Sequence, residues 1–568
     1  MTVGVRYQAS GLRPQGPGVR PQRPIEWPPV SRSVLSLVLL SSLTFFLGLG
    51  RQAITDSDEA FYAESAREMV ESGDWITPRF NYADRWQKPI LYYWLTASAY
   101  LVTGPTEGAA RWWSALSGLG LVLLTWAAAR RLTNRDEAAW LAGAVTATSF
   151  GCFAMARLAL PDLPLAFLIT LTIWTALEER WLLAGAAAGL GFLMKGPVAL
   201  AVPALVLLPI WWREHRRLPA PPRALASALV VLVLVGLPWY VVMTATHGVE
   251  YLQSFFVADN LERFATARFN EPRPLWFYLP ILLGGLLPWS VYLVVVPFRS
   301  AIEVLRRRRR LTPDEWRLLI WAGVPLLFFT LSIGKQPRYI LPVLPPLAML
   351  LARSIARRVR EGDAGGRRAL AVSTWVTAAL LGVLAILLLR ARPLFLTAHP
   401  LLTSAGVAVI GASAAAFAWL AAARAWRRLP VVAACCAALV LLAVQFGALA
   451  GTRPEPVEQM AALVARHRPS GEPVGAYQVL VRNLIFYTRV QQVDLVDEGL
   501  ALDFLRSPGR VLMVVRALDL PRLESLSGVT TQRLGEVRYL DTANVRLRTL
   551  ISPIPGQDVE TVLLVANR

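Results

Sequence analysis

The sequence predicts a polytopic α-helical membrane protein with about thirteen transmembrane helices and a C-terminal soluble α/β domain. Of its 568 residues, 55% are hydrophobic, and the mean hydropathy of +0.45 is too high for a soluble protein of several domains. Apolar runs recur along most of the chain and are separated by short clusters of arginine. After about residue 452 these runs stop, and a segment of mixed character follows.

The apolar runs give the expected helices one by one. A membrane-spanning helix needs about 20 apolar residues to cross the hydrocarbon core. Several of the runs are short or merge with the next run. The predicted spans begin near residues 34, 109, 138, 163, 181, 197, 225, 275, 318, 340, 370, 402 and 430.

The basic clusters predict the orientation of these helices. The formal net charge of +20 comes mostly from clusters in loops, which indicates a membrane protein and no nucleic-acid partner. With the basic N-terminus inside, alternation of the spans puts all the main clusters in the cytoplasm, although the lesser pair Arg390 and Arg392 falls outside. The main clusters are Arg130 and Arg131, Arg213 to Arg217, Arg306 to Arg310, Arg353 to Arg360, and Arg424 to Arg428.

These boundaries divide the chain into three parts. Residues 1–33 form a cytoplasmic basic N-terminus, which we interpret as part of an uncleaved anchor because no small-residue cleavage site follows it. Residues 34–451 form the transmembrane domain, in which residues 51–108 are the first periplasmic loop. Residues 452–568 form a periplasmic α/β domain.

Short elements are expected on the outer side of the membrane. The segment Asp56–Met69 reads as an amphipathic helix, and the aromatic-rich segment Ile90–Val102 is too short to span and predicts an interface helix. In the C-terminal part the pattern predicts a helix at Val457–His467 and strands at Val474–Val481, Arg510–Val515 and Thr561–Ala566.

The cysteines predict neither a disulfide framework nor a cysteine metal centre. Cys152, Cys435 and Cys436 all lie inside apolar runs, and no pair has the spacing of a zinc site.

Acidic residues at the outer membrane surface are the first candidates for chemistry. Asp56, Asp58 and Glu59 directly follow the first span, and Asp162 lies in a proline-flanked turn between two apolar runs. A helix start or a helix cap explains the same residues without chemistry. As catalytic groups, Asp58, Glu59 and Asp162 would activate an acceptor hydroxyl, and Asp58 with Asp162 would hold a divalent metal ion.

Cationic residues gather on the same predicted side of the membrane, against the usual bias. They are Lys88, Lys195, Arg263, Lys335 and Arg338. The three lysines are the whole lysine content of an arginine-rich chain, which favours a role that needs a compact ammonium. Snorkelling at helix ends is the alternative explanation for these basic residues. A bound phosphate explains all of them together.

Several motifs resemble one known family. The stretch DSDEAFYAESAREMVESGDWITPRFNYADRWQKPILYYWL is similar to the first periplasmic loop of the aminoarabinose transferase and protein mannosyltransferase superfamily, the GT-C membrane glycosyltransferases. Its further motifs are matched, in the same order, by ARLALPDLPLAF, FLMKGPVAL, DNLERF and GKQPRYILPVLPPL. The similarity covers roughly residues 35 to 350.

The resemblance implies a GT-C fold and transfer of a sugar from undecaprenyl phosphate, with inversion at the anomeric carbon. Asp58 matches the acid of the first loop that is regarded as catalytic, and Asp162 matches a second essential acid. The groups that hold the carrier phosphate are matched by Lys88, Lys195, Arg263 and Tyr339. The implied partners are a polyprenyl-phosphate-linked sugar, the bilayer, and a lipid or protein acceptor in the periplasm.

One departure from the family pattern concerns the metal. Related aminoarabinose transferases carry a metal-binding Glu before the Lys-Pro of the first loop, where this chain has Gln87. The change leaves metal binding open and weakens the assignment of lipid A as acceptor. Two alternatives remain from other classes, a transporter or flippase of polyprenyl-linked sugar and a non-catalytic scaffold. A transporter should show internal repeats and deep charges. Neither is evident in the sequence.

Overall fold

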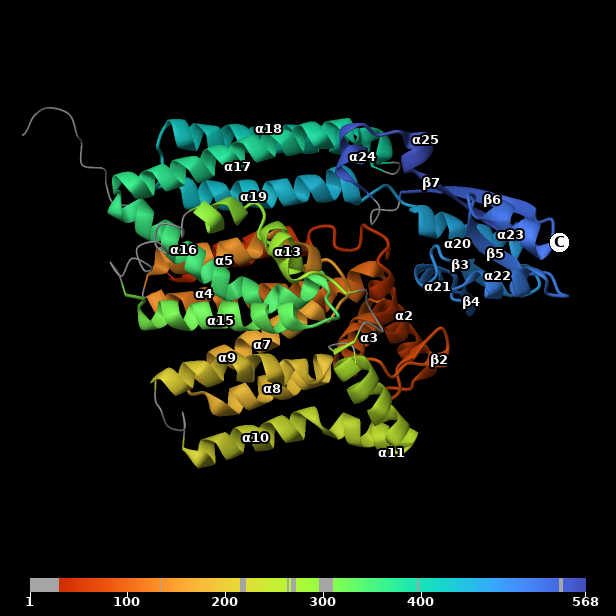
Figure 1. Ribbon diagram of the computed structural model, residues 1–568, viewed down its shortest axis with the longest axis horizontal. Coiled ribbons are helices and arrows are strands. Elements are labelled where there is room, and N and C mark those ends of the chain that lie inside the picture. Colours follow the sequence, from red (N-terminus) through yellow and green to blue (C-terminus); the bar gives the residue numbers. More distant parts are fainter. Residues whose placement is uncertain are drawn as a thin grey trace, which may run out of the picture.

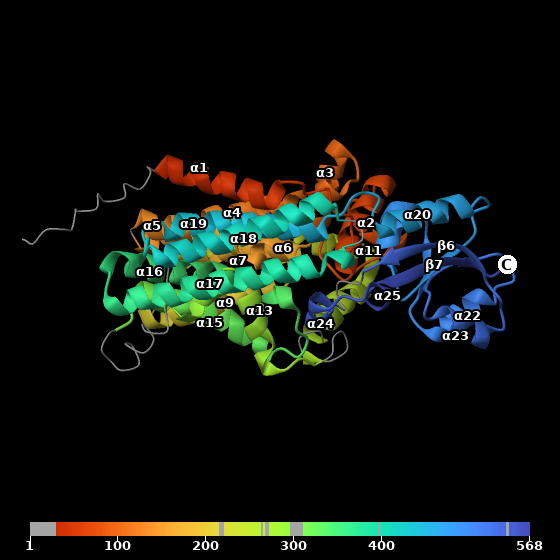
Figure 2. The ribbon, with the colours of Figure 1, turned by 90° about the horizontal axis from the view of Figure 1, so that it is seen from above.

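The computed structural model describes residues 30–133, 135–214, 221–262, 265–266, 272–295, 310–395, 398–540 and 545–568. Long helices run side by side along most of the molecule, and a mixed sheet with its helices lies at one end (Figure 1). Between the two lie the short helices of the first loop (Figures 1 and 2). The predicted N-terminal segment 1–33 falls almost entirely outside the described residues.

A described helix overlaps each of the predicted spans. Most of these helices contain long apolar stretches, and proline residues begin or interrupt several of them. Their bounds are α1 Val30–Ser41 with the π-helix η1 Ser42–Phe46, α4 Glu107–Thr133, α5 Asp136–Ala147, α6 Phe150–Ala156, α7 Asp162–Leu177, α8 Trp181–Lys195, α9 Val198–Glu214, α10 Pro222–Gly236, α11 Pro238–Leu252, η2 Gln253–Glu262, η3 Leu275–Phe277, α13 Tyr278–Gly285, α15 Pro313–Leu331, η4 Pro337–Val343, α16 Leu344–Glu361, α17 Ala364–Arg390, η5 Arg392–Leu394, α18 Pro400–Ala422, α19 Leu429–Val444 and η6 Gln445–Leu449.

The number of helices that cross a membrane stays a prediction. Within the described residues, 5 helices are long and apolar enough to span by themselves, and up to 7 if two bent pairs each count as one span. Other apolar helices, such as Asp162–Leu177 and Trp181–Lys195, are shorter than 18 residues. At about 1.5 Å per residue such a helix is shorter than the roughly 30 Å hydrocarbon core. The structure therefore supports a multi-pass helical protein without fixing the number thirteen.

The first loop folds into two helices and a small hairpin. Its elements are α2 Ser57–Ser72, β1 Arg79–Phe80, β2 Ala83–Asp84 and α3 Leu91–Thr103. The Asp56 carboxylate caps α2 by accepting from the backbone N–H groups of Asp58 and Glu59, and Gly73 ends the helix with a left-handed φ of 69°. Helices are thus found at both segments where the sequence predicts them.

The polar face of α2 is buried, although an amphipathic helix usually turns its polar face to solvent. Glu64, Arg67 and Glu68 are all buried. Arg67 pairs with Glu64 and reaches Glu71 and the Tyr82 hydroxyl, so the charges of this face are satisfied inside the protein. The charged side of this helix is therefore part of the protein interior.

The C-terminal part is an α/β unit with a five-stranded mixed sheet. The strand order is β4-β3-β5-β7-β6, in which β4, β3 and β5 are parallel and β7 pairs antiparallel with β5 and β6. The elements are α20 Pro456–His467, β3 Val474–Tyr477, α21 Asn483–Thr488, β4 Gln492–Leu495, α22 Glu498–Leu505, β5 Leu512–Arg516, α23 Leu520–Ser527, β6 Gln532–Tyr539, α24 Leu547–Ile551, α25 Pro555–Asp558 and β7 Glu560–Ala566.

The sequence pattern located β3, β5 and β7 but missed β4 and β6. The central strands β3 and β5 are apolar on both faces, whereas the two middle positions of β4, Val493 and Asp494, are exposed. Edge strands such as β4 and β6 have a weak apolar pattern, which explains why they are hard to see in the sequence.

Hydrogen bonds join this unit to the first loop. The Asn81 side chain donates to the Gln492 carbonyl (2.7 Å) and accepts from the Gln492 N–H (2.8 Å). The Tyr487 hydroxyl accepts from the Ile54 N–H at 2.8 Å and contacts Glu107 at 3.0 Å. The C-terminal unit is therefore docked directly on the loop that carries Asp58.

Candidate active site

A cavity of about 950 Å³ lies between the first loop, the helix ends and α21. Its polar wall brings together residues that are far apart in the sequence and that the sequence singled out: Asp58, Lys88, Asp162, Lys195, Arg338 and Tyr339. Its other walls are apolar, with Val198 and Ala201 of α9 and Phe328 and Phe329 of α15. The cavity thus combines charge with a surface suited to an apolar chain.

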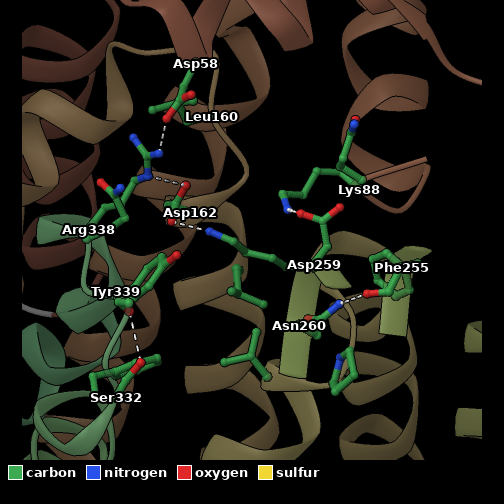
Figure 3. A pocket seen from close by; sticks show the side chains of 18 of the residues that line it. Asp58, Lys88, Leu160, Asp162, Phe255, Asp259, Asn260, Ser332, Arg338 and Tyr339 are labelled. Atoms are coloured by element: carbon green, nitrogen blue, oxygen red, sulfur yellow. Dashed lines mark hydrogen bonds and ion pairs between the residues drawn. The ribbon is translucent and has the colours of Figure 1, made fainter. Parts of the chain in front are cut away.

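Two carboxylates are bridged by one guanidinium in the polar wall (Figure 3). Arg338 contacts the Asp58 carboxylate directly, and its Nε lies 3.4 Å from Asp162 Oδ2. Lys195 Nζ lies 2.5 Å from the other oxygen of Asp162. The order Asp58, Arg338, Asp162, Lys195 forms a continuous chain of alternating charges.

The local fold explains how the two acids reach the same wall. Asp58 lies in the first turn of α2, where the Asp56 cap fixes the backbone. Asp162 begins α7 and is buried, and Pro161 and Pro164 on either side restrict the turn. Arg338 and Tyr339 both come from the 3-10 helix η4.

The charge pattern lowers the pKa of the Asp58 carboxyl group. Burial opposes ionisation of this group, but the attraction of Arg338, with smaller contributions from Arg482 and Lys195, outweighs burial and lowers the pKa below its ordinary value. Asp58 is therefore a carboxylate at neutral pH and a weak proton acceptor.

A second pair of charges closes another side of the cavity. Lys88 Nζ lies 3.6 Å from Asp259 Oδ1, and Asp259 is buried in η2 (Figure 3). Next to it, the Asn260 side chain donates to the Phe255 carbonyl at 2.7 Å. The pair connects the first loop with the segment after α11. Lys195 Nζ also lies 5.3 Å from the centroid of the Tyr339 ring, and this contact further fixes the position of the ammonium group.

Glu59 does not belong to this wall, contrary to the catalytic role expected for it. Its carboxylate is fully buried and forms a two-point ion pair with Arg111, at 2.7 and 3.0 Å. It also accepts from the Ala159 N–H at 2.9 Å. Glu59 therefore holds α2 against α4 and the segment before Asp162, and it is a positioning residue.

Two further residues that the sequence predicts to bind phosphate, Lys335 and Arg263, are not among the described residues that line the cavity. Lys335 is buried and donates to the carbonyl groups of Arg273 (3.1 Å) and Ser332 (2.5 Å), so its ammonium stabilises the loop before η4 and does not line the cavity. Arg263 lies outside the described residues.

The structure adds lining residues that the sequence did not single out as functional. Asp259, Asn260, Gln336, Arg85 and Arg482 all line the cavity. Asp259 and Asn260 lie within the DNLERF motif, and Gln336 within GKQPRY, so motif position would have indicated these three. Arg482 had no such signal, because it lies in a part of the chain without a recognised motif.

The residues present do not fit a tightly bound divalent metal. The candidate ligands Asp58 and Asp162 are already neutralised by Arg338 and Lys195. Gln87, which lines the cavity, offers a neutral amide instead of a carboxylate. Within the described ranges no group of three His, Cys, Asp or Glu side chains is arranged to hold a metal. We therefore assign no step to a metal ion.

Comparisons with known proteins found relatives of similar sequence. Residues 35–252 match the family model of dolichyl-phosphate-mannose-protein mannosyltransferase. The chain is 32% identical over 381 residues to the undecaprenyl phosphate-alpha-4-amino-4-deoxy-L-arabinose arabinosyl transferase 2 of Proteus mirabilis, covering 63% of this chain and 66% of that protein. It is 36% identical over 347 residues to the corresponding transferase of Pseudomonas aeruginosa, covering 58% and 61%. The matched segments thus span somewhat less than two thirds of the relatives' length.

Solved structures show the same fold over nearly the whole chain. The structure of ArnT from Cupriavidus metallidurans bound to undecaprenyl phosphate superposes with a TM-score of 0.70 at 23% identity, covering 95% of this chain and 99% of ArnT. The archaeal oligosaccharyltransferase of Archaeoglobus fulgidus superposes with a TM-score of 0.50 at 13% identity, covering 86% and 69%. These matches show that the chain is similar in sequence to undecaprenyl phosphate-aminoarabinose arabinosyl transferases and shares the fold of ArnT.

Proposed function

We propose that this protein is an inverting glycosyltransferase that moves a sugar from an undecaprenyl-phosphate carrier to an acceptor at the periplasmic face of the inner membrane. The observation that carries the proposal is the cavity itself, where alternating acidic and basic side chains face an apolar wall. A lipid-borne phosphate needs both surfaces, cations for its oxygens and apolar groups for its chain.

The donor phosphate is the leaving group, and its departure places negative charge on its oxygens. Lys88, Lys195, Arg338 and Tyr339 line the cavity and are the groups that would stabilise this charge, together with Arg263. Their effect is largest where little water competes. Lys195 is well placed because its side chain is only 15% exposed.

The transfer step balances without a redox or metal cofactor. An acceptor oxygen forms a bond to the anomeric carbon from the face opposite the carrier, which inverts the configuration. The bond between the anomeric carbon and the carrier oxygen breaks, and its electron pair stays on the phosphate. A hydroxyl acceptor also loses a proton, which Asp58 would take, with Asp162 holding Arg338 in place.

The state of Asp58 favours an acceptor that is already ionised. A carboxylate with a lowered pKa is a poor base for a Ser or Thr hydroxyl. A phosphate oxygen on a lipid A-like acceptor needs no deprotonation and only has to be oriented. Transfer to Ser or Thr of exported proteins is the second candidate, because the matched family model describes a protein mannosyltransferase.

A site that faces the periplasm implies an orientation for the rest of the chain. Residues 1–33 would lie in the cytoplasm, and the first loop, residues 51–108, would lie in the periplasm with the domain of residues 452–568. The contacts between Asn81 and Gln492 require the loop and this domain to share one side of the membrane.

The Asp58→Asn variant tests the proposal. Wild-type protein, incubated with labelled undecaprenyl-phosphate-linked 4-amino-4-deoxy-L-arabinose and a membrane extract, should label an acceptor, and the variant should lose this activity by about 100-fold or more. The substitution keeps side-chain size, so the thermal unfolding midpoint should stay unchanged. Full activity in the variant contradicts the role of Asp58. Movement of labelled donor across vesicles, without product, would instead indicate a flippase.

A further inference from the structure

Arg482 connects the C-terminal domain to the cavity. Among the described residues that line the cavity, Arg482 is the one that belongs to residues 452–568. Its guanidinium carbon lies 4.5 Å from the centroid of the Phe61 ring, and that of Arg85 lies 3.6 Å from the same centroid. Phe61 follows Asp58 by one helical turn on α2, so both guanidinium groups lie near the catalytic carboxylate.

These two arginines differ from the other cations of the cavity. Lys88, Lys195 and Arg338 each form an ion pair with an aspartate. In the part of the chain that the structure describes, neither Arg85 nor Arg482 lies within ion-pair distance of a carboxylate, and Arg85 Nε is buried without a hydrogen-bond partner. Guanidinium groups that lie outside direct ion pairs and border a cavity attract an anion.

The backbone around Arg482 is firmly placed. The side chain of the next residue, Asn483, is buried and donates to the Ile54 carbonyl at 3.1 Å, and the Ile54 N–H donates to the Tyr487 hydroxyl at 2.8 Å. Ile54 lies two residues before the Asp56 cap of α2. The position of Arg482 relative to Asp58 is therefore set by direct contacts and not by a long linker.

The location of Arg482 distinguishes the arginine pair from the cations proposed to bind the donor phosphate. The donor's lipid chain must lie along the membrane helices, where Val198, Ala201 and Phe328 form the apolar wall. Arg482 belongs to the C-terminal domain, which lies beyond the first loop as seen from the long helices (Figure 1). An acceptor that arrives from the side of this domain would approach the part of the cavity that Arg482 lines.

We propose that Arg482, together with Arg85, forms a subsite for a phosphoryl group of the acceptor, so that the C-terminal domain supplies a specificity-determining residue of the active site. The inference rests on the proposed glycosyl transfer. An anionic acceptor next to the Asp58 carboxylate is repelled unless extra positive charge offsets the repulsion. Arg85 and Arg482 supply that charge, and their forked donors match phosphoryl oxygens.

The experiment compares two acceptor probes and two variants. Initial rates are measured with the undecaprenyl-phosphate-linked 4-amino-4-deoxy-L-arabinose donor at saturation, against lipid A and against the same lipid A after removal of its phosphates. Arg482→Gln should raise the acceptor KM for phosphorylated lipid A by about tenfold and remove the preference over the dephosphorylated probe. Arg482→Lys should restore part of the loss. The matched control is Arg533→Gln, an exposed arginine of β6 in the same domain.

A binding measurement distinguishes loss of the acceptor subsite from damage to the donor site and from loss of folding. Affinity for undecaprenyl phosphate alone, and the thermal unfolding midpoint, should be the same in Arg482→Gln, Arg533→Gln and wild type. A change in undecaprenyl phosphate affinity, or an acceptor KM equal to that of Arg533→Gln, would overturn the inference while transfer itself stands. Equal wild-type rates with both lipids, or transfer only to Ser or Thr peptides, would overturn it as well. No transfer by wild type to any acceptor would reject the proposed function, and the inference with it.

Discussion

Arg338 contacts both Asp58 and Asp162, the two carboxylates of the proposed site. Without this guanidinium, the two carboxylates would share one wall of the cavity with only Lys195 to neutralise them. The attraction of Arg338 therefore explains why the pKa of Asp58 is lowered although burial opposes its ionisation.

The pH dependence of transfer should report this arrangement. In wild type, Arg338 helps to lower the pKa of Asp58, so activity that needs the carboxylate falls only at low pH. In Arg338→Gln the pKa of Asp58 rises, and the acidic limb of the kcat/KM profile should move to higher pH, with the maximum reduced by about 100-fold. Arg338→Lys retains a charge and should show a smaller movement. An unmoved acidic limb in Arg338→Gln would contradict the assignment.

The neighbouring acids Asp58 and Glu59 have different roles that thermal unfolding can separate. Glu59→Gln leaves the Arg111 guanidinium buried without its charge partner, which costs about 3–5 kcal/mol and should lower the unfolding midpoint markedly. Asp58→Asn should leave the midpoint near that of wild type and remove transfer. The measurement is differential scanning fluorimetry on detergent-purified protein. Equal midpoints for both variants would show that the Glu59–Arg111 pair does not stabilise the fold.

Helix α2 also carries a buried acid that makes stability depend on pH. Burial, and next the repulsion from Glu64, raises the pKa of Glu68 to about 7. The unfolded pKa is near 4.5, so the folded protein holds this proton more tightly. The contribution of this tightly held proton to the free energy of unfolding is complete below the unfolded pKa, and it is lost as pH rises through about 7.

The unfolding midpoint of wild type should therefore decline between about pH 5 and pH 8. Glu68→Gln removes the titrating group while keeping an amide to accept from the Tyr82 N–H, so its midpoint should vary less over this range. Glu536→Gln, at an exposed position of β6, is the control and should follow wild type. If Glu68→Gln shows the same slope as wild type, another group causes the decline.

The fold as a whole requires the first loop and the C-terminal domain to lie on one side of the membrane. Their hydrogen bonds, from Asn81 to Gln492 and from Ile54 to Tyr487, join residues more than 400 positions apart. The connection between α16 and α17 is expected on the other side, because the adjoining ends of both helices are rich in arginine.

Cysteine labelling tests this orientation. In a background where Cys152, Cys435 and Cys436 are replaced by alanine, Ser470→Cys should react with a membrane-impermeant maleimide on intact spheroplasts. Arg367→Cys, in the first turn of α17, should react only after permeabilisation. Both positions are exposed, so accessibility depends on the side of the membrane. Labelling of Arg367→Cys in intact spheroplasts would reverse the proposed orientation.

Much of the architecture is local and was therefore predictable. A helix forms wherever an apolar run has the required length, so the predicted spans overlap helices such as α4, α17 and α18. The helix of the first loop begins where Asp56 and its neighbours indicated a cap. The sequence could not decide which short or bent helices cross the membrane, because that depends on neighbouring helices and tilt.

The sequence by itself determined the type of protein and predicted which charged residues share one side of the membrane, because hydropathy and basic clusters act along the chain. Only the tertiary structure decided which of these residues meet. Successive residues of a helix point about 100° apart, so Asp58 faces the cavity while Glu59 faces Arg111. Arg482 reaches the same cavity through packing between distant segments, and no local pattern encodes such a contact.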